Sequence, residues 1–362
     1  MNPNKTIFFF LGSLKVGGTE VVATRIQKSL IDRGFNVKFL LLKDLVELPV
    51  ENLESSILHL NTQRFSNKLV KILYAYYGLW KNYLKYKPYR IVSFSSGLNI
   101  LLLFSLLPGQ VLTVDTNLFW VKSKLYRRKI LKFAGYFPQV KKVLVPSNQL
   151  RLKFEGYVKG KSFKKFVTIY NPIAKFSSNN RSIEENSGAP FLVSVGRLQK
   201  YKGFEQLIRC FAASRFNSDI KLYILGSGDM EEKLENLILD LNMEEKIKLL
   251  GFKKYPEFYI SKSEGLILNS TFESFGNVLV EGLSLGVPVI SNDCDFGPRE
   301  IIEHGINGLL YDKSKDENLI RVLEEFVNSE TLKYKLRKNT SFQMERFENN
   351  KITEEWIEKI LQ

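Results

Sequence analysis

The stretch N-S-T-F-E-S-F-G-N-V-L-V-E-G-L, residues 269–283, has the pattern of a loop that opens a helix. It follows a short apolar run, residues 265–268, that is typical of a buried strand, and Ser, Thr and Gly stand where a turn is expected. The first backbone N–H groups of a helix have no partner within it, so they suit a phosphate. The sequence therefore predicts an anion-binding turn whose donors come from Gly276, Asn277, Val278 and Leu279.

Two glutamates accompany this turn. Glu273 precedes it in the loop, and Glu281 lies about one helical turn beyond its start. A carboxylate is a poor ligand for phosphate but a good acceptor for the hydroxyls of a sugar. Two carboxylates around a phosphate-binding turn predict a sugar on one side and a ribose on the other, which is the layout of a nucleotide sugar.

The motif continues past the second glutamate. Gly-x-x-x-Gly-x-Pro-Val-Ile follows at 282–290, D-C-D-F-G-P-R-E-I-I at 293–302 and Gly-x-Asn-Gly-Leu-Leu at 305–310. With two glutamates separated by seven residues, this run resembles the C-terminal signature of GT-B glycosyltransferases of family 4. The continuation at 293–310 is similar to members that add sugars to polyprenyl-diphosphate-linked or surface glycans.

The resemblance implies an α/β fold of the GT-B type, in which two Rossmann-like domains face each other across a cleft. Because 362 residues exceed one typical core, two domains are also expected from length alone. We predict an acceptor-binding domain at 1–175, a donor domain at 188–345 and, at 346–362, a C-terminal helix that crosses back to the first domain.

The start of the chain predicts a βαβ unit. An apolar strand at 6–11 leads through a glycine loop at 13–20 into a helix, and a second strand follows at 36–42. Gly17 and Gly18 would let the backbone approach a diphosphate, and the family has a similar glycine pair that faces the donor. A tight turn with nothing bound is the alternative. The loop lacks the full dinucleotide fingerprint, which disfavours a dehydrogenase.

The loop after the strand at 191–195 reads G-R-L-Q-K-Y-K-G and resembles the family's Gly-Arg-Leu…Lys-Gly loop, whose Arg and Lys clamp the donor diphosphate. A guanidinium and an ammonium can neutralise a leaving diphosphate without a metal. The predicted catalytic residues are therefore Arg197, Lys202 and Glu273. The predicted donor-binding residues, besides those of the two helix starts, are Gly196, Gly226, Phe252, Phe275 and Glu281.

The sequence departs from the family in the N-terminal half. Many relatives have a histidine near the reacting sugar, where this chain has Asp115-Thr116-Asn117. Asp115 or Asn117 is a candidate contact to donor or acceptor, and a capping role for Asp115 is the alternative. Asp293-Cys294-Asp295 spells the Asp-x-Asp of metal-using transferases, but before Gly-Pro we interpret it as a turn and predict no metal or other cofactor.

The positive charge is concentrated in one segment. The chain has a net charge of +15, and residues 55–154 contain seventeen lysines and arginines but one acidic residue, Asp115. Two blocks, 64–90 and 122–142, mix these cations with aromatic side chains, as interfacial membrane helices do. We predict an anionic membrane surface as partner; helices whose rings pack in the core are the alternative. Without a nucleic-acid motif, nucleic acid is not expected.

Localisation is predicted from three further features. The apolar run at the N-terminus is too short for a signal peptide, and the longest apolar stretch, 100–108, is under half of a membrane span. Cys210 and Cys294 are expected to be buried, reduced thiols. These features favour a cytoplasmic protein that is peripheral at the inner face of the cell membrane.

Three hypotheses for function remain. The first is a retaining glycosyltransferase that moves a hexose or N-acetylhexosamine from a nucleotide sugar, with UDP expected, to a lipid-linked or surface glycan. The second is a GT-B enzyme with a soluble acceptor or a nucleotide-sugar epimerase, and the third is a non-catalytic glycan-binding scaffold. A glycoside hydrolase is disfavoured, because Glu281 facing a ribose leaves no second carboxylate for the scissile bond.

Overall fold

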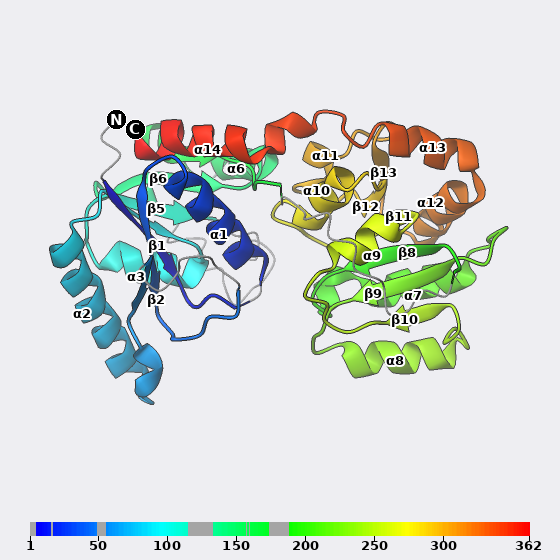
Figure 1. Ribbon diagram of the computed structural model, residues 1–362, viewed down its shortest axis with the longest axis horizontal. Helices are drawn as coiled ribbons and strands as arrows, with labels where there is room; N and C mark the ends of the chain where they lie inside the picture. The colour runs from blue at the N-terminus through cyan, green and yellow to red at the C-terminus, as the bar shows by residue number, and fades with distance from the viewer. Residues whose placement is uncertain are drawn as a thin grey trace. The chain divides into compact units, whose positions relative to one another are not determined.

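The computed structural model describes residues 5–15, 17–48, 56–114, 133–156, 158, 160–173 and 188–362. The chain divides into two compact units. Unit 1 consists of Met1–Pro172 and Phe347–Gln362, and unit 2 of Ile173–Arg346. Each unit contains one parallel sheet with helices between successive strands, so the predicted α/β class is confirmed (Figure 1).

The sheet of unit 1 has the strand order β3-β2-β1-β4-β5-β6-β7, and each neighbouring pair is parallel. A parallel sheet is covered on both faces, which explains why its central strands are almost entirely apolar. The strands are β1 (Thr6–Leu11), β2 (Asn36–Leu41), β3 (Ile57–His59), β4 (Arg90–Ser93), β5 (Gln110–Thr113), β6 (Val140–Val145) and β7 (Phe166–Thr168).

The predicted βαβ start is present: β1 leads into α1 (Gly18–Ile31), and β2 follows. Among the described residues of unit 1, the other helices of eight residues or more before the C-terminal segment are α2 (Lys68–Tyr86), α3 (Ser96–Phe104) and α6 (Asn148–Glu155). In the described ranges, no helix is both long and apolar enough to cross a bilayer.

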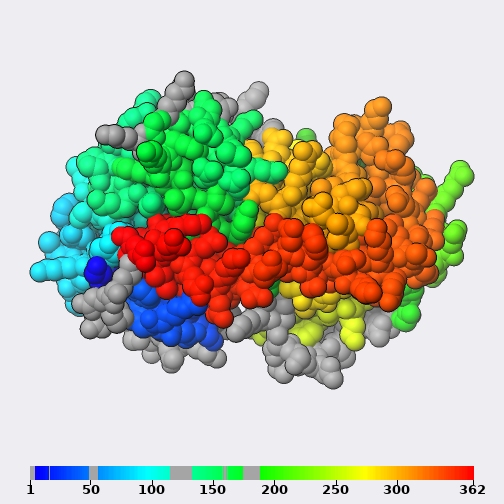
Figure 2. Space-filling view, turned by 90° about the horizontal axis from the view of Figure 1, so that it is seen from above, coloured from blue at the N-terminus to red at the C-terminus, as the bar shows by residue number. Residues whose placement is uncertain are grey.

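The C-terminal segment completes the core of unit 1. Helix α14 (Asn349–Trp356) continues in a turn to Leu361 and packs against α1 (Figure 2, red beside blue). The Trp356 side chain is 1% exposed, and its ring stacks on that of Phe94 with centroids 6.3 Å apart. The expected return of the C-terminal helix to the first domain is therefore observed.

The sheet of unit 2 has the strand order β10-β9-β8-β11-β12-β13, again with parallel pairs only. Its strands are β8 (Phe191–Val195), β9 (Lys221–Leu225), β10 (Ile247–Leu249), β11 (Gly265–Leu268), β12 (Val289–Asn292) and β13 (Gly308–Tyr311). Its helices are α7 (Phe204–Ala213), α8 (Glu231–Asp240), α9 (Glu257–Lys262), α10 (Asn277–Ser284), α11 (Pro298–Ile301), α12 (Asp316–Asn328) and α13 (Glu330–Lys338).

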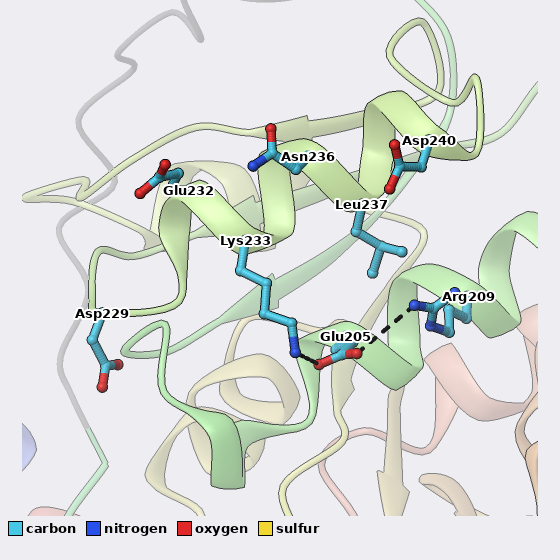
Figure 3. A pocket seen from close by; sticks show the side chains of 8 residues that line it. All are labelled: Glu205, Arg209, Asp229, Glu232, Lys233, Asn236, Leu237 and Asp240. Atoms are coloured by element: carbon cyan, nitrogen blue, oxygen red, sulfur yellow. Dashed lines mark hydrogen bonds and ion pairs between the residues drawn. The ribbon is translucent and has the colours of Figure 1, made fainter.

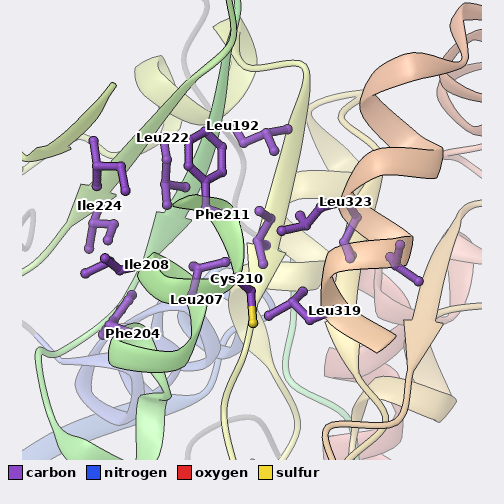
Figure 4. Close-up of a cluster of buried hydrophobic side chains, with 14 of the residues drawn as sticks. Leu192, Phe204, Leu207, Ile208, Cys210, Phe211, Leu222, Ile224, Leu319 and Leu323 are labelled. Atoms are coloured by element: carbon purple, nitrogen blue, oxygen red, sulfur yellow. The ribbon is translucent and has the colours of Figure 1, made fainter. Parts of the chain in front are cut away.

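The main core of unit 2 lies where α7 and α12 pack on the sheet. Figure 4 shows side chains of both helices, such as Phe211 and Leu323, directed at one another and at the strands. A Cβ on Gly265 would lie 2.8 Å from the ring of Phe326, so the glycine lets this ring lie directly against β11. This packing fixes the strands whose ends carry the candidate site.

Both sheets have a switch point, where the strand order changes direction. It falls between β1 and β4 in unit 1 and between β8 and β11 in unit 2. The loops that leave the carboxyl ends of such a strand pair run in opposite directions and leave a crevice, which is where open α/β sheets bind ligands.

Candidate active site

The switch point of unit 2 brings together two loops that are far apart in sequence. The loop after β8 contains Arg197 and Lys202, and the loop after β11 contains Glu273. Because β8 and β11 are neighbours and parallel, both loops leave the same edge of the sheet. Two of the three predicted catalytic residues therefore come into direct contact.

That contact is an ion pair between Lys202 and Glu273. The Lys202 Nζ atom donates to Glu273 Oε1 at 2.6 Å, and the two side chains are 17% and 14% exposed. The hydroxyl of Ser270 donates to the same oxygen, also at 2.6 Å. The cation is thus held beside a carboxylate with limited access to water, where its charge acts more strongly than on an open surface.

Backbone and ring contacts fix the two loops to each other. The Thr271 N–H donates to the Tyr201 carbonyl at 2.7 Å, and the rings of Tyr201 and Phe272 stack with centroids 4.8 Å apart. The Asn269 amide donates to the Gly203 carbonyl at 2.7 Å. Lys202 and Glu273 therefore lie on a joined pair of loops.

Arg197 lies on the same loop as Lys202 but is exposed. Its guanidinium donates to the Tyr201 hydroxyl at 3.3 Å. The loop is supported from behind by the turn after β9: the Leu198 N–H donates to the Ser227 carbonyl at 2.9 Å. Gly226 has a φ of 146°, and a Cβ there would collide with the Gly196 carbonyl, so this approach requires glycine.

The start of α10 departs from the prediction in one respect. The N–H of Leu279 donates to the Gly276 carbonyl at 2.9 Å and is therefore not an unpaired donor. The prediction overlooked that the first turn closes more tightly than an ideal α-helix. Phe275 is 2% exposed, and its carbonyl lies against Gly297, so this residue supports the loop from within. Asn277, Val278 and Glu281 are half-buried on the helix.

Phe252 follows β10 and has a 56% exposed side chain. The Gly226 N–H donates to the carbonyl of the neighbouring Gly251 at 2.8 Å, so the turns after β9 and β10 are joined. Phe252 is therefore an accessible residue next to the glycine turn.

The remaining predicted residues lie in unit 1. Gly17 is the N-cap of α1, and Gly18 is its first residue. A carboxylate oxygen of Glu20 lies 2.5 Å from the position that a Cβ on Gly17 would take, so this side chain occupies the space beside the helix start. Asp115 and Asn117 fall outside the described residues.

The Asp-x-Asp sequence has a structural partner. Asp293 accepts two hydrogen bonds from the Arg299 guanidinium, and this contact raises the pKa of Arg299. Between its two aspartates, Cys294 is buried; burial, followed by the charge of Glu273, raises the pKa of its thiol to about 12. In the part of the chain that the structure describes, no group of three His, Cys, Asp or Glu side chains could hold a metal ion.

Two residues below the joined loops make structural contacts that the sequence did not indicate. Tyr311 and Lys313 come from the end of β13 and the turn after it, and both contact Asn269. Burial lowers the pKa of Lys313 to about 8. No motif marks Lys313, because its partners lie more than forty positions earlier in the chain.

A hollow elsewhere on unit 2 has a different character. It has a volume of about 360 Å³, lies between α7 and α8, and none of the predicted site residues lines it (Figure 3). Glu205 forms ion pairs with Lys233 at 2.8 Å and with Arg209 at 3.8 Å. The lining residues are Glu205, Arg209, Asp229, Glu232, Lys233, Asn236, Leu237 and Asp240. Three of its charged groups, Glu205, Arg209 and Lys233, are therefore paired with one another.

Comparison with known proteins shows which protein family unit 2 resembles. The model of the family described as "Glycosyl transferases group 1" matches residues 176–342. Over these residues the chain is similar to that family. The matched segment corresponds closely to unit 2, Ile173–Arg346, and contains the ion pair and the start of α10.

Curated relatives carry related names. An N-acetylgalactosaminyltransferase of Campylobacter jejuni, which acts on N-acetylgalactosamine-N,N'-diacetylbacillosaminyl-diphospho-undecaprenol, is 33% identical over 55% of this chain and 54% of its own length. The lipopolysaccharide 1,6-galactosyltransferase of Escherichia coli K12 is 33% identical over 45% of this chain and 46% of its own. The chain therefore spans about half the length of these relatives.

The fold of the whole chain has solved counterparts. Anabaena HepE, in complex with UDP and glucose, superposes with a TM-score of 0.81 at 20% identity and covers 99% of this chain and 100% of its own. Such neighbours are GT-B glycosyltransferases with two Rossmann-like domains. The chain therefore has the GT-B fold, as predicted.

Proposed function

We propose that this protein is a retaining, metal-independent glycosyltransferase of family 4 that takes a hexose or N-acetylhexosamine from a UDP-sugar. The observation that carries the proposal is the Lys202–Glu273 pair at the switch point of a glycosyltransferase domain. The acceptor is a lipid-linked or surface glycan, in line with the names of the curated relatives.

The diphosphate is bound by the two cations of the first loop. Arg197 and Lys202 neutralise the charge that develops on the leaving diphosphate as the bond from the sugar C1 to the phosphate oxygen breaks. The backbone N–H groups at the start of α10, around Gly276 and Asn277, face the same group. When the donor binds, Lys202 must give up part of its ion pair with Glu273 in order to contact the diphosphate. Donor binding therefore also alters the hydrogen bonding of the Glu273 carboxylate.

The remaining residues bind parts of the donor that do not react or that define its orientation. Glu273 accepts hydrogen bonds from the sugar hydroxyls, and Glu281 accepts them from the ribose. Phe252 lies against the base, beside the turn of Gly226. The acceptor oxygen forms the new bond to C1 on the face that the diphosphate leaves, and its proton passes to a diphosphate oxygen. Asp115 and Asn117, both in the chain segment of unit 1, remain candidate contacts to donor or acceptor.

A panel of nucleotide sugars tests this proposal. Purified protein is incubated with each of several UDP-, GDP- and ADP-sugars in EDTA, and thermal shift and slow release of free sugar are recorded. We expect one UDP-sugar to raise the melting temperature and to be hydrolysed without metal. Lys233→Met, which removes an exposed cation from the surface hollow, is the matched control and should behave like wild type. Binding of no nucleotide sugar, or turnover only with added metal, would contradict the proposal.

Helix α2 supports the proposed membrane partner. Its outward face carries a stripe of apolar side chains at three- or four-residue spacing, each between 42% and 65% exposed: Leu69, Leu73, Tyr77, Trp80 and Leu84. The opposite face, with Ala75 and Leu79, is buried. Lys81 and Lys85 flank the stripe and are exposed. An apolar stripe beside cations suits an anionic bilayer, which supports our proposal of a peripheral enzyme at the cytoplasmic, inner face of the membrane.

Co-sedimentation with anionic vesicles tests the membrane contact. Leu73→Glu should reduce the bound fraction at least several-fold, because it places a like charge in the interface. Leu239→Glu is the matched control, since Leu239 is similarly exposed, at 54%, on α8 of unit 2. Equal binding of both variants and wild type would exclude α2 as the contact.

A further inference from the structure

The side chain of Lys313 ends underneath the two joined loops. Its Nζ atom donates to the Asn269 carbonyl and lies 3.4 Å from the Thr271 hydroxyl. Thr271 is the residue whose N–H donates to the Tyr201 carbonyl, directly before Lys202. The ammonium therefore contacts the second loop at Asn269 and at Thr271, just before Glu273.

Asn269 connects the same ammonium to the first loop. Its side-chain amide donates to the Gly203 carbonyl at 2.7 Å, and its side-chain oxygen accepts from the hydroxyl of Tyr311, which is 4% exposed. Gly203 has a φ of 71°, and a Cβ there would collide with both the Asn269 carbonyl and Lys313 Nζ. The close fit leaves no room for a side chain between the loops.

From these contacts we infer that Lys313 is a positioning residue, which holds the Glu273 loop against the Lys202 loop and so sets the geometry of the proposed site. The inference rests on the proposed function and adds to it a residue that touches neither donor nor acceptor. Its ammonium is partly desolvated, which makes each hydrogen bond stronger than at an open surface and costly to leave unpaired. A displacement of about 1 Å in such a site can cost on the order of 10²-fold in rate.

The first arm of the test does not depend on activity. Lys313→Met keeps the length of the side chain and removes its donors. Hydrogen exchange of the Thr271 amide, followed by mass spectrometry with fragmentation to single residues, should accelerate at least tenfold in this variant. Lys315→Met, which removes an exposed ammonium two positions away, is the matched control and should exchange like wild type. Unchanged exchange of Thr271 in Lys313→Met would overturn the inference.

The second arm tests the role in turnover with the UDP-sugar that wild type uses. In Lys313→Met, kcat should fall about 10- to 100-fold while the donor KM changes less than threefold, because donor contacts remain and the reacting geometry is lost. An unchanged kcat despite faster exchange would overturn the positioning role. Absence of turnover in wild type would instead refute the proposed function, and the exchange arm would still decide whether Lys313 joins the loops.

Chemical rescue separates positioning from general destabilisation. Lys313→Cys treated with 2-bromoethylamine acquires a side chain of similar length that ends in an ammonium, with loss of bromide and the thiol proton. Burial raises the pKa of Cys210 and Cys294 to about 12, so the native thiols should react slowly, and treated wild type controls for them. We expect at least tenfold recovery of kcat. No recovery in a folded, fully alkylated variant would overturn the inference.

Discussion

The two units share a strand order but differ in what stands at their switch points. In unit 1 two neutral side chains meet beside the end of β4: Ser93 and Asn99 hydrogen-bond to each other, and the Asn99 amide donates to the Thr113 carbonyl at 2.6 Å. The Glu20 carboxylate lies beside the start of α1. In unit 2 the corresponding place holds the ion pair of Lys202 and Glu273. The fold supplies a crevice twice, and the side chains in the loops decide which ligand it suits.

The surfaces of the units differ as well. Of the exposed large hydrophobic side chains among the described residues, fourteen lie in unit 1 and four in unit 2, and seven of the fourteen lie on α2. A cluster of this kind on one helix indicates a contact surface, whereas scattered apolar side chains need no explanation. The units therefore divide the proposed tasks: donor chemistry in one and attachment in the other.

The largest effect is expected from variants that remove the Lys202–Glu273 ion pair at the switch point of unit 2. Lys202→Met should lower kcat by about 10²- to 10⁴-fold, because the leaving diphosphate loses a preorganised cation. Glu273→Gln should have a comparable effect, and the double variant should lose less than the product of the two, since the residues act as a unit. Steady-state kinetics with the preferred UDP-sugar measures all three. Strict multiplicativity would show that the pair has no joint role.

A second prediction separates the stabilities of the two units. Trp356→Ala should destabilise unit 1 by about 3–5 kcal/mol, and Phe326→Ala should do the same to unit 2, because both side chains are fully buried. All three tryptophans, Trp80, Trp120 and Trp356, lie in unit 1, so tryptophan fluorescence reports on that unit.

Urea unfolding followed by fluorescence and by circular dichroism distinguishes the two variants. Trp356→Ala should shift the fluorescence transition to lower urea, and Phe326→Ala should shift only the circular dichroism. Coincident shifts in both variants would mean that the units unfold as one, and the comparison between them would not extend to stability.

A smaller effect is expected at Glu281. Replacement by Ala should raise the donor KM about tenfold and leave kcat nearly unchanged, since the ribose does not react. Comparison of a UDP-sugar with its 2′-deoxyribose analogue checks the reason: the variant should no longer distinguish them. A fall in kcat equal to that of Glu273→Gln would place Glu281 at the reacting centre instead.

The pH dependence of stability gives the smallest predicted difference. The folded-state pKa of Lys313, about 8, lies below its ordinary value of 10.5 because the side chain is buried. Between these values the unfolded chain binds a proton that the folded chain does not, so this residue makes unfolding less favourable as pH rises. The stability of wild type relative to Lys313→Met should therefore increase from pH 8 to 10 in chemical denaturation. Parallel pH profiles would contradict the desolvation of Lys313.

Much of the fold and part of the site followed from local pattern. The apolar run at 6–11, the glycine loop and the next strand predicted the βαβ start, and the motif from 269 to 310 predicted the GT-B fold. The same local reasoning overstated the donors of α10, because it assumed ideal helical geometry and Leu279 closes onto Gly276. It also said nothing about Lys313, whose role depends on contacts with a loop more than forty positions earlier in the chain.

The sequence by itself therefore determined the helices and strands and the types of side chain in the loops after the strands. Both depend on residues that are close together in the chain. Only the tertiary structure decided which of these groups meet. The order β8-β11 places Lys202 beside Glu273, seventy-one positions apart, and β13 brings Lys313 beneath both loops. Strand neighbours in a parallel sheet are chosen by the packing of the whole core, and no local pattern contains that choice.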